Sequence, residues 1–162
     1  MNTKIHVRYG LIFAAIDILL FVVFYNVNHQ LPSFFFLMAV ALLLIAAVVI
    51  SCFQYTKLTS DKLTVGNIFS NGFRTVAVVT VVFGLAVVIF TKTMPGFKEK
   101  MLTEASENAR KADPTLTDKD IKENQALLEQ RLTASSLAGI IFPQLILGTI
   151  AAGITAFALK KQ

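Results

Sequence analysis

The chain has 162 residues, of which 55% are hydrophobic and only 15% are charged, and its mean hydropathy is +0.66. A soluble globular domain carries about 25% charged residues, so this composition excludes an ordinary soluble protein. The charges are also unevenly placed, because none falls within residues 30–56, 75–91 or 132–159. Each of these stretches is long enough for a helix that crosses the roughly 30 Å hydrocarbon core of a bilayer.

A fourth apolar stretch, residues 9–28, is interrupted only by Asp17. The sequence therefore predicts an all-α membrane protein in which residues 1–162 form a single membrane domain. A charged helical hairpin is expected between the third and fourth of its transmembrane helices, which are predicted at residues 9–27, 34–54, 74–92 and 135–159. Lys4 and Arg8 before the first run would also suit a signal peptide, but no small-residue cleavage site follows the run.

Asp17 lies in the middle of the first predicted span. Helical spacing places it on the same face as Gly10 and Ala14, and small residues mark faces that pack against another helix. We therefore expect the acid to point into the bundle. No Lys or Arg lies at its depth, so the expected partners are the hydroxyl groups of Thr80, Thr149 and Thr155. Two interpretations stay open: an interhelical hydrogen bond worth about 0.6–2 kcal/mol, or a binding site for a proton or cation.

The connection before the third span, "LTVGNIFSNGF" (residues 63–73), has the spacing of an amphipathic helix. Its apolar positions are Val65, Ile68, Phe69 and Phe73, and its polar positions are Asn67, Ser70 and Asn71. This pattern favours a short helix that lies in the inner membrane interface before Arg74 begins the span. The alternative is that the third span starts early and tilts.

Residues 94–132 form the only soluble segment and are expected to fold as a helical hairpin. Pro95 marks a helix start, because proline is favoured in the first turn. A residue that precedes proline disfavours the α region, so Asp113–Pro114 is expected to break the helix. Thr117 followed by Asp120 resembles a capping box and starts a second helix. Nothing after this cap forces a stop, so the second helix is free to run into the fourth span.

The fourth span combines small residues with a proline. The small residues recur every four positions and form a face that lets helices approach closely: Gly148, Ala152 and Ala156. Pro143 should kink the helix and free the carbonyl of Gly139, with Gln144 beside it. In a transporter, such a broken helix indicates a binding site. In isolation, a proline in a membrane helix is a tolerated structural feature, and Gln144 is then a residue that simply faces the loop side.

The placement of charges predicts the orientation in the membrane. The termini and the short loop on one side carry seven basic residues: Lys4, Arg8, Lys57, Lys62, Arg74, Lys160 and Lys161. The short loop on the other side, residues 26–33, carries no Lys or Arg. The positive-inside rule predicts both termini in the cytoplasm and residues 94–132 outside, the orientation of a protein of the inner (cytoplasmic) membrane. The basic pI of about 9.5 follows from this topology, so no nucleic-acid partner is expected.

Four segments stand out in order along the chain: "VRYGLIFA" (7–14), "LTVGNIFSNGFRTVAV" (63–78), "MPGFKEKMLTEASENARK" (94–111) and "LILGTIAAGITAFALKKQ" (145–162). Together they resemble the DUF4199 family, small bacterial membrane proteins of unknown function found mainly in the Bacteroidetes. The resemblance covers nearly the whole chain, and it is carried by the order and spacing of the segments. Because the function of the family is unknown, the resemblance assigns no catalytic or binding residue, and Asp17 is not part of the family pattern.

No arrangement of catalytic residues is recognisable. His6 and His29 are predicted on opposite sides of the membrane, which excludes a joint site. Cys52 is the single cysteine, so no intramolecular disulfide can form and a metal site is not expected. We therefore expect neither an enzyme nor a bound cofactor or metal.

Two functions remain for a protein whose surroundings are the lipid bilayer. The leading hypothesis is a non-enzymatic accessory or scaffold protein that offers its hairpin or a helix face to a membrane-protein partner. The alternative is a small transporter or channel component that works as a homo-oligomer, with Asp17 as its proton or cation site. The two differ in one feature, because a transporter needs polar residues that converge at mid-depth from several spans, and a scaffold does not.

Overall fold

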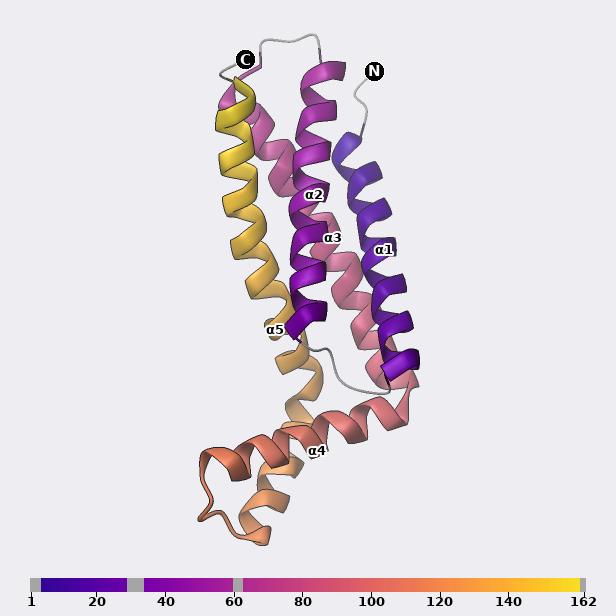
Figure 1. Ribbon diagram of the computed structural model, residues 1–162, viewed down its shortest axis with the longest axis vertical. Helices are drawn as coiled ribbons and strands as arrows, with labels where there is room; N and C mark the ends of the chain where they lie inside the picture. The colour runs from indigo at the N-terminus through magenta and orange to yellow at the C-terminus, as the bar shows by residue number, and fades with distance from the viewer. Residues whose placement is uncertain (1–3, 29–33, 60–62, 161–162) are drawn as a thin grey trace.

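The computed structural model describes residues 4–28, 34–59 and 63–160. Within these ranges the chain forms no β-strand and five α-helices: α1 (Ile5–Asn28), α2 (Phe34–Leu58), α3 (Val65–Thr93), α4 (Pro95–Ala112) and α5 (Asp118–Lys160). The first three helices and the second half of α5 run side by side as a bundle, and α4 crosses one end of it (Figure 1). The central helix is α3, which contacts all four others.

Four helices contain a segment that is long and apolar enough to cross a membrane. These segments are Ile5–Asn26, Phe35–Leu58, Val65–Thr93 and Leu137–Lys160. The prediction of an all-α protein with four membrane-crossing helices is therefore confirmed. Large apolar side chains point away from the bundle along the middle of these segments, as a lipid-facing surface requires, and exposed charged side chains such as Arg8 and Lys92 lie near their ends.

The third of these helices begins at Val65, earlier than predicted. The interfacial helix expected over residues 63–73 is wrong, because these residues form the first turns of α3 itself. Thr64 caps α3, and its hydroxyl accepts a backbone N–H from the first turn at 3.1 Å. Asn71 was expected on the polar face of that interfacial helix. It is instead buried, with 5% exposure, and hydrogen-bonded inside the bundle. Because this polar group has a partner there, the segment need not stay at the interface.

The charged segment folds as the predicted hairpin of two helices. The chain reverses at Asp113–Pro114, between the end of α4 and the start of α5, which confirms the predicted break. From Asp118, α5 then continues without interruption to Lys160, a helix of 43 residues. Its first half therefore belongs to the hairpin and its second half is the fourth membrane-crossing segment.

The start of α5 carries a reciprocal cap. The Thr117 N–H donates to Asp120 Oδ2 at 2.9 Å, and the Asp120 N–H donates to Thr117 Oγ1 at 3.3 Å. In the preceding turn, the Thr115 N–H donates to Asp113 Oδ1 at 3.0 Å. Hydrogen bonds from each threonine, first from its hydroxyl and then from its N–H, lower the pKa of Asp113 and Asp120 below the usual carboxyl value.

Small residues allow α3 and α5 to pack closely. A β-carbon at Gly148 would lie 2.5 Å from the side chain of Val76, and one at Gly72 would lie 3.0 Å from the Ala152 Cβ. Ala156 belongs to the same buried cluster. The face of Gly148, Ala152 and Ala156 is thus used inside the chain, against α3.

An aromatic cluster fixes α4 to the bundle. Phe97 is only 2% exposed, and its ring lies 5.3–5.7 Å from the rings of Phe21, Tyr25 and Phe90 in edge-to-face arrangements. Two exposed ion pairs also join the helices of the hairpin: Lys98–Glu129 and Arg110–Asp118. Because exposed ion pairs contribute little, the buried ring of Phe97 is the main anchor.

Gly148→Ala should destabilise the protein by about 1–3 kcal/mol. The added methyl group would overlap Val76, whose β-branched side chain has little rotamer freedom in a helix. Thermal unfolding of the purified protein in detergent, followed by circular dichroism, measures the change.

The matched control is Gly153→Ala, because nothing lies within 4 Å of a β-carbon at that position. We expect this change to be neutral, or to stabilise the protein by up to about 1 kcal/mol through helix propensity. Equal destabilisation by both variants would contradict the close packing of α3 on α5.

Acidification should fray the first turn of α5. A carboxyl pKa that is lower in the folded state contributes stability above the unfolded value of 3.8, and this contribution is lost as the pH falls through the lower folded value. The protection factor of the Ile121 amide against hydrogen exchange, which corrects for the intrinsic rate at each pH, should therefore fall below about pH 4. Asp120→Asn should remove this pH dependence, and an unchanged dependence in that variant would contradict the assignment.

Candidate functional site inside the bundle

Asp17 is fully enclosed by the bundle, with 0% of its surface exposed. Neither carboxylate oxygen has a hydrogen-bond partner, and the acid forms no ion pair with any residue in the described ranges. Its inward direction and the absence of a basic contact agree with the predictions, but the predicted hydrogen bond to a hydroxyl group is wrong. A buried carboxylate without a partner is a costly group, so Asp17 weakens the fold unless something binds to it.

Thr80 of α3 is a second buried polar residue, 2% exposed, and its hydroxyl also has no hydrogen-bond partner. Two contacts show how the parallel helices α1 and α3 are aligned. A β-carbon at Gly10 would lie 2.6 Å from Val78. The rings of Phe21 and Phe83 are 6.2 Å apart. On α1 the acid lies seven residues after the first contact and four before the second, and on α3 Thr80 lies two residues after the first and three before the second. At 1.5 Å per residue the two groups are therefore at most about 7.5 Å apart along the bundle axis.

Gln144 of α5 is the third residue of this kind, 8% exposed, with no partner for its Oε1. The helices α3 and α5 are antiparallel, and Gly148 meets Val76. Gln144 precedes Gly148 by four residues and Thr80 follows Val76 by four, so the two polar side chains are level. Three helices therefore bring unpaired buried oxygens to the middle part of the bundle: Thr80 and Gln144 are level, and Asp17 lies within about 7.5 Å of them along the axis.

The register of α5 corrects the other two predicted partners of the acid. Thr149 follows Gly148 and is therefore nearer the end of the bundle that holds the chain termini. Thr155, 8% exposed, lies about 16 Å along the axis from Gln144, at 1.5 Å per residue. The prediction treated all hydroxyls in the span as equally deep. The contacts of α5 with α3 show instead that both threonines lie nearer the end of the bundle that holds the chain termini.

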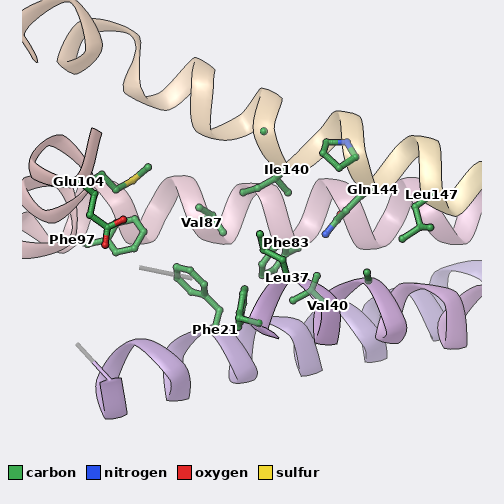
Figure 2. Close-up of a pocket in the computed structure, with 15 residues that line it drawn as sticks. Phe21, Leu37, Val40, Phe83, Val87, Phe97, Glu104, Ile140, Gln144 and Leu147 are labelled. Atoms are coloured by element: carbon green, nitrogen blue, oxygen red, sulfur yellow. The ribbon is translucent and has the colours of Figure 1, made fainter. Parts of the chain in front are cut away.

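A cavity of about 450 Å³ extends from the hairpin past Gln144 to Leu147, and Asp17 and Thr80 are not among the residues that line it. Its walls come from all four bundle helices and from α4, and they are apolar except at Glu104 and Gln144. Figure 2 shows Gln144 extending from α5 toward Val40 of α2, and Glu104 far from it beside Phe97. One end of the cavity is thus covered by the charged hairpin, and Gln144, whose Oε1 is unpaired, lines it toward the other end.

A separate polar group joins α2 to α3 near the other end of the bundle. Ser51 and Thr75 share a hydrogen bond of 2.7 Å between their hydroxyls, and the Asn71 side-chain amide donates to the Ser51 hydroxyl at 2.9 Å. Sequence reasoning missed this group. The spacing of Ile68, Asn71 and Thr75 along one helical face was the signal that could have revealed it.

No group of three or more His, Cys, Asp or Glu residues that could hold a metal ion occurs in the part of the chain that the structure describes. Cys52 is buried between α2 and α3, and its thiol donates to the Ile68 carbonyl at 3.5 Å. His29, expected opposite His6, lies outside the described residues.

Thr80→Val should be neutral or should stabilise the protein by about 1–2 kcal/mol, because it removes a buried hydroxyl that has no partner. Thr75→Val is the matched control and should destabilise by about 1–3 kcal/mol, because it leaves the hydrogen-bonded Ser51 short of a partner. Thermal unfolding compares the two. A loss of stability in Thr80→Val as large as in Thr75→Val would show that the Thr80 hydroxyl is in fact satisfied.

Comparison with known proteins identifies the family of the chain but assigns it no activity. No curated protein and no solved structure matches it. A family model described as a protein of unknown function (DUF4199) matches residues 8–161, nearly the whole chain. The resemblance read from the order of the sequence segments is thereby confirmed, and the chain belongs to the DUF4199 family.

Proposed function

We propose that the protein is a transporter component of the bacterial inner membrane, and not an enzyme, and that it binds a lipophilic organic cation in the cavity between α2 and α5. One observation carries this proposal: three buried polar side chains with unpaired oxygens lie in the middle part of the bundle, and one of them, Gln144, lines an apolar cavity. Convergence of polar residues at mid-depth is the feature that separates a transporter from a scaffold, so it favours the transporter.

The class of ligand follows from the lining of the cavity. Its volume of about 450 Å³ lies in the usual range for small-molecule sites, which are mostly apolar with a few polar groups. Aromatic rings attract cations to their faces, and four rings line this cavity: Phe21, Phe36, Phe83 and Phe97. Its one charged lining residue, Glu104, is acidic. A lipophilic molecule with a positive charge satisfies both features.

Asp17 has the role of the titrating group in this proposal. An ionised carboxylate that is buried without a cation costs several kcal/mol, so the acid holds a proton when no cation is near. Asp17 does not line the cavity, but it lies one helical turn before Phe21, which does. When a cation enters the cavity, the acid releases its proton to water, and the carboxylate balances the positive charge from behind the cavity wall. Gln144 supplies an oxygen at the cavity, and Thr80 supplies one that is level with it inside the bundle. Binding of the ligand and release of the proton would thereby be coupled.

The proposed topology has both termini in the cytoplasm and the charged hairpin outside, because the termini and the short loop opposite the hairpin carry seven Lys and Arg residues, whereas the short loop 26–33 carries none. Four spans seldom enclose a pathway alone, so we propose a homo-oligomer. The small-residue face of α5 is occupied by α3 and is not available to a second copy. The surface that α5 leaves exposed is formed by Ile146, Ile150, Ile154 and Phe157.

A second candidate function is that of an accessory protein, as the leading sequence hypothesis has it. The charged hairpin favours it, because α4 and the first half of α5 bury few residues and present mainly charged and polar side chains. Phe97 holds this charged surface against the bundle. A partner of complementary charge could then dock on the hairpin without altering the membrane core.

Ethidium, an aromatic cation, tests the proposed site when it is titrated into the purified protein in detergent and followed by fluorescence. Gly139→Leu puts a side chain into the cavity without a clash, because Gly139 lines the cavity and nothing lies within 4 Å of a β-carbon there. We expect this variant to bind ethidium about tenfold more weakly. Gly153→Leu, equally open but away from the cavity, should bind it normally.

Asp17→Asn tests the coupling in the same series. In proteoliposomes with a pH gradient, this variant should lose ethidium uptake while its thermal stability stays normal, because the amide cannot release a proton. Equal binding by the two glycine variants would contradict the cavity as the site. Proton-driven uptake that persists in Asp17→Asn would contradict the role of the acid.

A further inference from the structure

A second pocket of about 380 Å³ lies at the end of the bundle opposite the hairpin. It is formed where α1 and α3 begin and α2 ends, which is also the end that holds both chain termini (Figure 1). Its lining is polar: Lys4 directly precedes α1 and His6 lies in its first turn, Tyr55 comes from α2, and Asn67, Ser70, Asn71 and Arg74 come from α3. It is thus the chemical opposite of the apolar cavity at the other end.

Positive charge in this pocket is not balanced by the surrounding protein. No acidic residue lines the pocket, and both ion pairs found among the described residues are in the hairpin. Lys4 and Arg74 therefore have no carboxylate partner in those ranges. Between residues 18 and 98 the sequence has a single acid, Asp61, which lies outside the described residues.

The neutral groups of the pocket are hydrogen-bond donors that suit an anion. The hydroxyls of Tyr55 and Ser70 and the side-chain amide of Asn67 join the two cations on its walls. The first turns of α3 contribute the positive end of a helix dipole, because Asn67 lies in the first turn of a 29-residue helix. A guanidinium beside an ammonium and hydroxyls is the set of groups that recognises phosphate oxygens.

We propose that this pocket binds a phosphate group, and that its source is the headgroup of an anionic phospholipid in the inner leaflet. The position explains the source, because the pocket lies at the ends of three membrane-crossing helices, where headgroups meet the protein. Basic pockets between transmembrane helices on the cytoplasmic side are suited to such headgroups. A soluble phosphate compound offers the same chemistry, and the experiment separates the two sources.

Phosphatidylglycerol titrated into the purified protein in a neutral detergent provides the test, with the bound lipid counted by native mass spectrometry. We expect Arg74→Gln to weaken lipid binding about fivefold, which corresponds to the loss of one basic contact at a membrane surface. Asn67→Asp is a second variant that preserves shape and helix start while it adds a negative charge, and it should weaken binding by a similar factor. Lys57→Gln is the matched control, because Lys57 lies over the Phe53 ring and does not line the pocket.

Inorganic phosphate then serves as competitor. If it leaves the bound lipid in place, the lipid headgroup is the ligand as proposed. If phosphate displaces the lipid, and this displacement depends on Arg74 and Asn67, the pocket binds phosphate groups but its ligand is a soluble phosphate compound. Equal lipid binding in Arg74→Gln, Asn67→Asp and Lys57→Gln would show only general attraction to a basic surface and would overturn the proposal. Absence of binding by both lipid and phosphate would overturn it as well.

Discussion

Close packing of α3 between α1 and α5 is the constraint on which the rest of the structure depends. Inside a bilayer the lipid tails are as apolar as the helix surfaces, so helices associate through van der Waals contact and need small residues where they meet. Gly10 provides this on α1, Gly148 on α5 and Gly72 on α3 itself. These contacts hold the helices too close for a β-carbon, and they fix how far each helix is shifted along its neighbour. Every statement about which residues are level follows from them.

The relative shift of neighbouring helices places buried polar groups in the bundle that have no hydrogen-bond partner. Ser51, Asn71 and Thr75 show that the same helices can satisfy buried polar side chains, since all three form hydrogen bonds across or within helices. Asp17 and Thr80 lie in the same bundle without any such bond. An unpaired buried polar group costs about 1–3 kcal/mol, more for a charged one, so the contrast between the two groups points to a site for binding and not to a packing device.

The continuous helix α5 links the hairpin to this site. Its first half packs against α4, and its second half forms a wall of the cavity that includes Pro143 and Gln144. Proline cannot donate the hydrogen bond to the residue four positions earlier, so α5 bends most easily at this point. Meanwhile Phe97 and Glu104 of α4 cover the far end of the cavity. A displacement of the hairpin would therefore change both the cover and one wall of the cavity at once.

The sequence by itself determined the number of membrane-crossing helices and their approximate positions, although not the early start of α3, because a bilayer core admits only long uncharged helical segments. It also determined the hairpin break at Asp113–Pro114 and the inward direction of Asp17, since proline geometry and small-residue faces are local properties. The spacing of Asn71 with Ile68 and Thr75 hints at a buried position, but only the tertiary structure shows its partner, because Ser51 lies on another helix. The tertiary structure alone decided that Gln144, and not Thr149 or Thr155, is level with Thr80. Which residues are level depends on the relative shift of α3 and α5 along the bundle axis. This shift is set by contacts between residues far apart in the chain, so local sequence patterns do not predict it.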